Sequence, residues 1–275
     1  MDAPDEASVR VGLAATDRGL PDASITTDPS MALAAAAAYA DRVARLAVQG
    51  AQIVVLPEKM VGVTSESADA VVKVFSDTAR AAHVTVIAGL SRNGVQPRRN
   101  VALVIAQDGT LVLEYEKRYL VPMIETTFAS GNTLGLFAGP GADWGVAICK
   151  DLDFPAWSRA YGQRGVRVMA VPAWDFVRDA RMHSRMAVMR GVENGFTIAR
   201  SAQEGLVTFS DAYGRILGEQ SSAADPMMVH NIPIGPGATL YTRYGDWFGW
   251  ANVMALGSLL LGLIPAIAPI SKRAG

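Results

Sequence analysis

The chain has 275 residues, half of them hydrophobic and 19% charged, which excludes an intrinsically disordered protein because ample apolar surface can offset the entropy cost of folding. The 25 basic and 26 acidic side chains nearly cancel, so there is no electrostatic footprint for binding nucleic acid, and small molecules or lipids are the expected partners. The single cysteine, Cys149, excludes an internal disulfide and a zinc site built from several cysteines.

Strand and helix patterns alternate along most of the chain. Short apolar runs predict strands and amphipathic stretches predict helices, with Asp28 as the expected N-cap of the first helix. In chain order we expect a strand at 9–15, a helix at 29–49, a strand at 52–57, a helix at 66–82, a strand at 84–90, a hairpin of 101–107 and 111–117, a strand at 144–148, a helix at 156–163, a strand at 166–171, a helix at 180–194, and a hairpin of 197–208 with 216–218. This order predicts a layered α/β domain whose sheets are covered by helices.

The two ends of the chain differ in character. Residues 1–8 carry three acidic side chains and no apolar run, which predicts a disordered N-terminus and no secretory signal peptide. Residues 247–270 carry no charge, begin with aromatic side chains and are followed by a basic tail at 271–275. This pattern predicts a transmembrane helix at 247–270, with 239–246 as a juxtamembrane segment and the C-terminus in the cytoplasm. The remainder would then be extracytoplasmic; a tail-anchored cytosolic protein and a buried core helix are the alternatives.

Three predicted strands end in a polar residue: Glu58, Lys117 and Cys149. Ligand sites of open α/β sheets gather beyond the strand ends, so these side chains are candidates to meet in one crevice. A thiol attacks a carbonyl poorly unless a base takes its proton, and an ammonium stabilises the oxyanion that the attack generates. The three residues therefore suit nucleophilic catalysis. Because side chains alternate along a strand, we expect Lys59 to face away from Glu58.

Three segments resemble the signatures of the nitrilase, or carbon-nitrogen hydrolase, superfamily. They are Leu56-Pro57-Glu58, the run Glu116-Lys117-Arg118-Tyr119-Leu120-Val121-Pro122 with Glu125 beyond it, and Ala147-Ile148-Cys149-Lys150-Asp151. The likeness runs from about residue 9 to 234 and implies a four-layer αββα sandwich, placed here at 9–238. It also implies a catalytic triad of Glu58, Lys117 and Cys149 with no metal and no organic cofactor. By the same resemblance, Glu125 orients Lys117 or assists proton transfer, and Trp174 and Asp175 bind substrate.

Within that superfamily the chain is most similar to the apolipoprotein N-acyltransferase family. Residues 117–122 with Glu125, and residues 239–248, resemble two runs of that family. The resemblance implies a thioester acyl-enzyme, a phospholipid acyl donor, a lipoprotein amine as acceptor, and a role in lipoprotein maturation at the membrane. Lys150 replaces the aromatic residue that usually follows the nucleophile, so we expect it to affect substrate binding.

Two other functions stay open at this stage. An amidase or carbamoylase that hydrolyses a small amide, tethered to the membrane, would use the same three residues. A nitrilase-like binding domain without turnover is the alternative outside enzymes. The sequence does not choose between a monomer and a dimer.

Overall fold

The computed structural model describes residues 7–17 and 23–263 and contains the expected alternation of strands and helices. Its elements, in chain order, are β1 (Ser8–Ala14), α1 (Pro29–Val48), β2 (Ile53–Val55), β3 (Val61–Val63), α2 (Ala68–Ala82), β4 (Thr85–Arg92), β5 (Arg98–Ile105), β6 (Leu111–Glu116), β7 (Phe128–Ala129), β8 (Gly135–Gly139), β9 (Ala142–Val146), the 3₁₀ helix η1 (Cys149–Asp153), α3 (Pro155–Gln163), β10 (Val168–Trp174), α4 (Ala180–Asn194), β11 (Thr197–Gln203), β12 (Leu206–Ser210), β13 (Ile216–Ser221), η2 (Ser222–Ala224), β14 (Met227–Pro233), α5 (Leu240–Tyr244) and α6 (Trp247–Leu263). Asp28 caps α1 as expected, because its side chain accepts a hydrogen bond from the backbone N–H of Ser30.

The strands form two sheets. The first has the order β14-β1-β2-β4-β5-β6, with β3 paired to β4 and β7 paired to β5; the second has the order β13-β12-β11-β10-β9-β8. Both sheets mix parallel and antiparallel neighbours. The sequence did not predict β3, β7, β8 and β14, which are short or carry glycine and polar residues that weaken the strand pattern.

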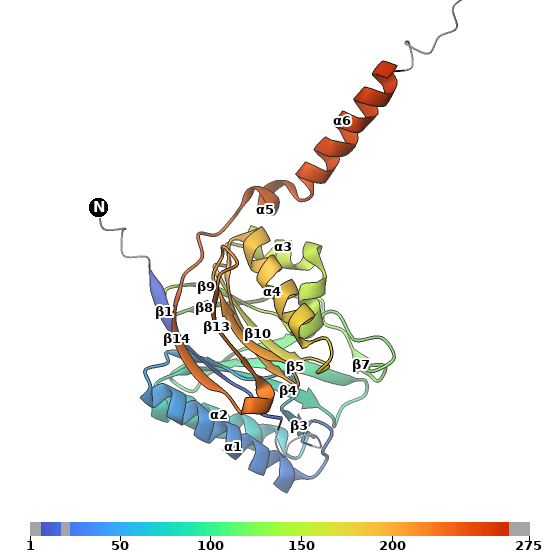
Figure 1. The fold of residues 1–275 in the computed structure, drawn as a ribbon. Coiled ribbons are helices and arrows are strands. Elements are labelled where there is room, and N and C mark those ends of the chain that lie inside the picture. Colours follow the sequence, from blue (N-terminus) through green and yellow to red (C-terminus); the bar gives the residue numbers. More distant parts are fainter. Residues whose placement is uncertain (1–6, 18–22, 264–275) are drawn as a thin grey trace, which may run out of the picture.

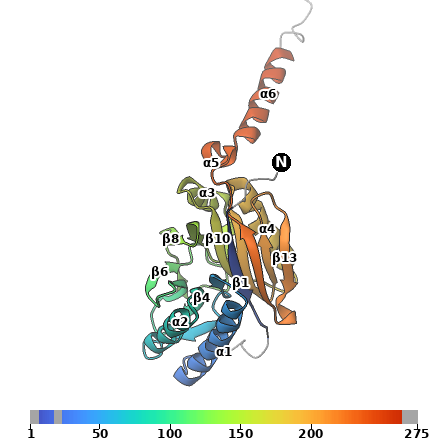
Figure 2. The same ribbon diagram turned by 90° about the vertical axis from the view of Figure 1, so that its left-hand side faces the viewer.

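Four layers follow from how the apolar side chains alternate on the strands. On β2 and β4, Val54 and Val86 face α1 and α2, whereas Ile53 and Ile87 face the second sheet. On β9 and β10, alternate residues likewise divide between the space between the sheets and the layer beneath α3 and α4. Figures 1 and 2 show α1 and α2 outside the first sheet and α3 and α4 outside the second. The α/β sandwich implied by the resemblance is therefore present.

The C-terminal helix α6 projects away from the sandwich (Figure 1), and nearly all of its described side chains are exposed. The sequence predicted a transmembrane helix at 247–270. Among the described residues, no helix combines the length and the apolarity needed to cross a bilayer. Residues 264–270 lie outside the part of the chain that the structure describes, as do 1–6 of the N-terminal segment expected to be disordered; β1 already begins at Ser8.

Candidate active site

Glu58 lies beyond the end of β2, in the turn that leads to β3, and this turn contacts the second sheet. Its backbone N–H donates to the carbonyl of Ala173 on β10, 3.3 Å away. The turn packs so closely on β4 that a Cβ on Gly89 would lie 2.2 Å from the Pro57 oxygen, so only glycine fits there. The side chain of Glu58, 1% exposed, is thereby buried.

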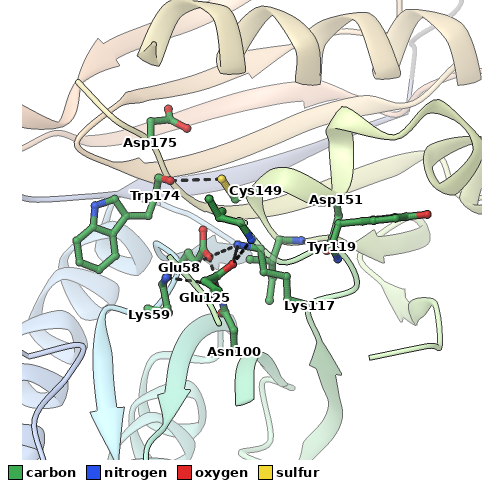
Figure 3. Close-up of polar contacts among 12 residues, drawn as sticks. Glu58, Lys59, Asn100, Lys117, Tyr119, Glu125, Cys149, Asp151, Trp174 and Asp175 are labelled. Atoms are coloured by element: carbon green, nitrogen blue, oxygen red, sulfur yellow. Dashed lines mark hydrogen bonds and ion pairs between the residues drawn. The ribbon is translucent and has the colours of Figure 1, made fainter. Parts of the chain in front are cut away.

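Lys117 and Glu125 complete a buried charged cluster with Glu58 (Figure 3). The Nζ of Lys117 donates to Oε1 of Glu58 over 2.7 Å and to Oε2 of Glu125 over 2.9 Å. Asn100, on the neighbouring strand β5, donates its Nδ2 to Oε1 of both carboxylates at 2.6 and 2.8 Å. Two cationic hydrogen bonds and an amide therefore fix the positions of both carboxylates.

The charges in this cluster keep both Lys117 and Glu125 ionised. Burial alone would lower the pKa of Lys117, but the carboxylates of Glu58 and Glu125 outweigh it, and the pKa is raised. Burial would raise the pKa of Glu125, yet Lys117 and Lys59 lower it. Oε2 of Glu58 is different, because it is buried and has no hydrogen-bond partner. A buried carboxylate oxygen without a donor is free to accept a proton.

Cys149 begins η1 directly after the apolar residues that follow β9. Its φ of 42° places it in the left-handed region, a conformation that costs about 1–3 kcal/mol in a residue other than glycine. The half-buried thiol donates to the carbonyl of Trp174 over 3.3 Å. Burial, reinforced by the charge of Glu58, raises the pKa of Cys149 to about 12, while Lys117 opposes the shift. The resting sulfur is thus a neutral thiol close enough to Glu58 and Lys117 to respond to both charges.

Asp151 ties the turn that carries Cys149 to the loop that follows Lys117. Its Oδ2 accepts from the N–H of Ile148 at 2.9 Å and from the Tyr115 hydroxyl at 2.7 Å, and its Oδ1 accepts from the N–H groups of Arg118 and Tyr119. Burial raises the pKa of Asp151 to about 6, although the hydrogen bonds oppose this. One carboxylate therefore connects two strand ends that come from different sheets.

Lys59 corrects an expectation from strand alternation. β2 ends at Val55 and Lys59 has φ 48°, so the chain turns and its side chain enters the site instead of facing away. Its Nζ donates to Oε1 of Glu125 at 3.0 Å and lies 3.9 Å from Oε1 of Glu58. It also sits 5.5 Å from the ring centroid of Trp174, a cation–π contact.

The three residues predicted to bind substrate lie in different surroundings. Trp174 lines a cavity next to the cluster. Asp175 forms a buried two-point ion pair with Arg200 and points away from the cluster in Figure 3. Lys150 pairs with Asp153 over 2.9 Å. Arg200 lies on another strand than Asp175, and Asp153 shares with Lys150 a 3₁₀ helix that was not predicted, so neither ion pair was expected from the sequence.

The cavity has a volume of about 330 Å³ and is lined by both apolar and charged residues. It is lined by Ser24, Ile25, Glu58, Lys59, Arg98, Lys117, Val121, Ile124, Glu125, Phe128, Trp174, Phe176 and Glu204. Sequence reasoning missed Asn100, Lys59 and Arg98. For Asn100 the sequence offers one sign, its place directly before the apolar run of β5; its side chain is 1% exposed in the fold.

Several known proteins resemble this chain in sequence. A family model described as carbon-nitrogen hydrolase matches residues 18–235. An apolipoprotein N-acyltransferase from Geobacter metallireducens is 34% identical over 114 residues, which cover 40% of this chain and 22% of the relative. An (R)-stereoselective amidase from a Pseudomonas species is 25% identical over 182 residues, or 62% of this chain and 64% of the amidase.

Solved structures show the same fold. An amidase from a Nesterenkonia species superposes with a TM-score of 0.72 at 23% identity, covering 89% of this chain and 95% of the amidase. Coverage of the N-acyltransferases is lower, because this chain spans only 22–30% of the length of the first three that it matches. The likeness to the amidase structure concerns the fold alone.

Proposed function

Because the chain belongs to the carbon-nitrogen hydrolase family, we propose that it is a thiol-dependent acyl-transfer enzyme that forms a thioester on Cys149. The observation that carries this proposal is the free Oε2 of Glu58, a buried oxygen without a donor, close to a thiol whose raised pKa keeps it protonated. Such a pair provides a base and a nucleophile that needs one.

In the proposed reaction, Glu58 accepts the thiol proton as the sulfur of Cys149 attacks the carbonyl carbon of an ester or amide. The ammonium of Lys117 stabilises the oxyanion that forms. When the tetrahedral intermediate collapses, the bond to the leaving alcohol or amine breaks, Glu58 returns the proton to the leaving group, and a thioester remains. An amine then attacks the thioester, Glu58 takes the proton of that amine, and the proton returns to the cysteine sulfur. Glu125 keeps Lys117 in position, since it accepts a hydrogen bond from the same ammonium.

The favoured donor is a phospholipid and the favoured acceptor is the N-terminal amine of a lipoprotein, as in lipoprotein maturation. Support comes from the relatives named apolipoprotein N-acyltransferase and from the exposed, uncharged helix α6. In this proposal, residues 9–238 form the catalytic domain, 239–246 a juxtamembrane segment and 247–270 a membrane anchor, with the tail 271–275 cytoplasmic and the catalytic domain extracytoplasmic. The opposite placement is a tail-anchored cytosolic enzyme.

A second candidate is hydrolysis of a small amide, in which water replaces the amine in the last step. The amidase relative favours it, since the chain covers 64% of its length. The cavity of about 330 Å³ is also of a size for a small molecule. Trp174 would contact the acyl group in either reaction because it lines that cavity.

Mass spectrometry separates the two reactions. The purified protein is incubated with phospholipid or with a panel of small amides, and Cys149 is searched for a bound acyl group while ammonia release is followed. Acyl groups from phospholipid on Cys149 that are passed to an added amine support the transferase, and ammonia release without lipid acylation supports the amidase. If Cys149→Ala leaves every activity unchanged, the thiol mechanism is wrong.

A further inference from the structure

Arg98 opens β5 on the face that carries Asn100. Alternation places residues 98 and 100 on the same side of the strand, with Cα atoms about 7 Å apart, since a strand rises about 3.3 Å per residue. Asn100 holds the carboxylates of Glu58 and Glu125, whereas Arg98 lies one step further along the strand and lines the same cavity. Arg98 is therefore a neighbour of the proposed reacting groups without being one of them.

Among the described residues, the guanidinium of Arg98 contacts only neutral groups. Its Nε donates to Oδ1 of Asn93 at 2.9 Å and its Nη2 to Oγ of Ser91 at 3.1 Å. Its Cζ lies 4.4 Å from the ring centroid of Phe128, which supports the planar group from one side. Nη1 makes no hydrogen bond to any residue that the structure describes. The contacts thus fix the orientation of the cation and leave one edge of it unused.

Arg98 differs from the two other cations of the cavity. Lys117 and Lys59 are paired with Glu58 and Glu125. Arg98 makes no ion pair within the described residues, and burial lowers its pKa, as expected for a cation that loses water without gaining an opposite charge. Glu204 also lines the cavity but does not pair with Arg98, so it leaves the unused edge open to a ligand.

We propose that Arg98 binds an anionic group, carboxylate or phosphate, of the acyl donor, and so selects donors that carry such a group near the scissile carbonyl. The inference rests on the proposed function, because it assigns a substrate class to that site. A guanidinium suits both anions, since its planar N–H groups match their oxygen atoms. A soluble amide with a carboxylate and a phospholipid with its phosphodiester are the two sources of this chemistry.

Two matched pairs of donors test the proposal with the full chain. Adipamate and hexanamide differ by a carboxylate at the end of the same six-carbon chain, and phosphatidylglycerol and diacylglycerol in detergent micelles differ by the phosphate headgroup. The measured quantity is the ratio of kcat/KM for the charged and the neutral member of each pair. This ratio is independent of the fraction of folded protein, so a partly unfolded variant does not disturb it.

We expect the wild-type protein to prefer the charged member of one pair, which identifies the source of the anion. Arg98→Met should reduce that preference about 10- to 100-fold, the usual effect of losing a charged hydrogen bond, and Arg98→Lys should restore part of it. The matched control is Arg99→Met, because Arg99 alternates to the other side of β5 and pairs with Glu116 over 3.4 Å. A wild-type protein without preference, or an unchanged ratio in Arg98→Met, overturns the proposal.

Failure of the proposed function gives a different result. If no donor acylates Cys149, direct binding of adipamate is measured by calorimetry to Cys149→Ala and to the double variant with Arg98→Met. Binding that weakens about tenfold or more in the double variant supports the anion site even though the chemistry was wrong, and equal binding overturns it.

Discussion

Replacing Glu58 with glutamine tests the proposed base while keeping its shape. The amide oxygen of glutamine can still accept from Lys117 and Asn100, which both donate to Oε1 of Glu58. The amide nitrogen then stands where the free Oε2 was, and it can only donate. The thiol of Cys149 must therefore lose its proton without help.

The structure sets the size of the effect. With the pKa of Cys149 at about 12, about one thiol in 10⁵ is ionised at pH 7, which corresponds to about 7 kcal/mol. A positioned general base recovers part of this and typically contributes about 10²- to 10⁴-fold. We expect kcat/KM of Glu58→Gln to fall by about that factor. Loss of the carboxylate charge lowers the pKa of the thiol somewhat, but the residual rate should still rise about tenfold per pH unit below it.

The assay is the rate of Cys149 acylation between pH 6 and 10, followed by mass spectrometry, with circular dichroism to verify folding. Glu116→Gln is the matched control, because Glu116 is a partly exposed acid that pairs with Arg99 on the surface. A folded Glu58→Gln variant that acylates within tenfold of the wild-type rate, or whose residual rate is independent of pH, would refute the role given to Glu58.

Three further substitutions test the surroundings of the site. Lys59→Met should move the acidic limb of the kcat/KM profile to higher pH, because the pKa of Glu125 rises when one of two neighbouring cations is lost; an unmoved limb contradicts this. Asp151→Asn should lower the free energy of unfolding by about 2–4 kcal/mol in urea titrations, since an amide nitrogen would face two backbone or hydroxyl donors. An unchanged free energy of unfolding would contradict the role of Asp151 in connecting the two strand ends. Asp175→Asn should cost about 3–5 kcal/mol of stability by leaving Arg200 buried without its counter-ion, and should leave KM unchanged in the folded fraction; a raised KM would instead support substrate binding by Asp175.

The layers of the fold could be predicted because they depend on patterns within short segments. The helix at 29–48 shows its cap, Asp28, and its apolar face in the sequence itself. The apolar runs before Glu58 and Cys149 are equally easy to recognise as strands in the sequence. Glycine-containing and polar strands such as β8 and β14 gave no such pattern, because their pairing is decided by neighbours that are distant in the sequence.

The site could be predicted only in part, for a related reason. Glu58 and Lys117 stand at strand ends, where position alone makes a side chain a candidate. Lys59 was misplaced because alternation holds only within a strand, and a residue with φ 48° is no longer in one. The resemblance placed Asp175 among the substrate-binding residues, and in the structure its carboxylate pairs with the buried Arg200 on the adjacent strand β11, a contact that no local pattern predicts.

Asp151 links the backbone next to Cys149 with the backbone next to Lys117, and so holds these two parts of the site at a fixed separation. Lys117 follows a strand of the first sheet and Cys149 a strand of the second, and within the part of the chain that the structure describes no strand of one sheet pairs with a strand of the other. Asp151 accepts from the backbone beside each of them, at Ile148 and at Arg118, so a shift of one turn must move the other. The desolvation cost that raises its pKa is the consequence of placing a carboxylate there. Because thiol and ammonium must act on the same carbonyl, a fixed separation is a condition for the proposed chemistry, and this buried carboxylate is one contact that maintains it.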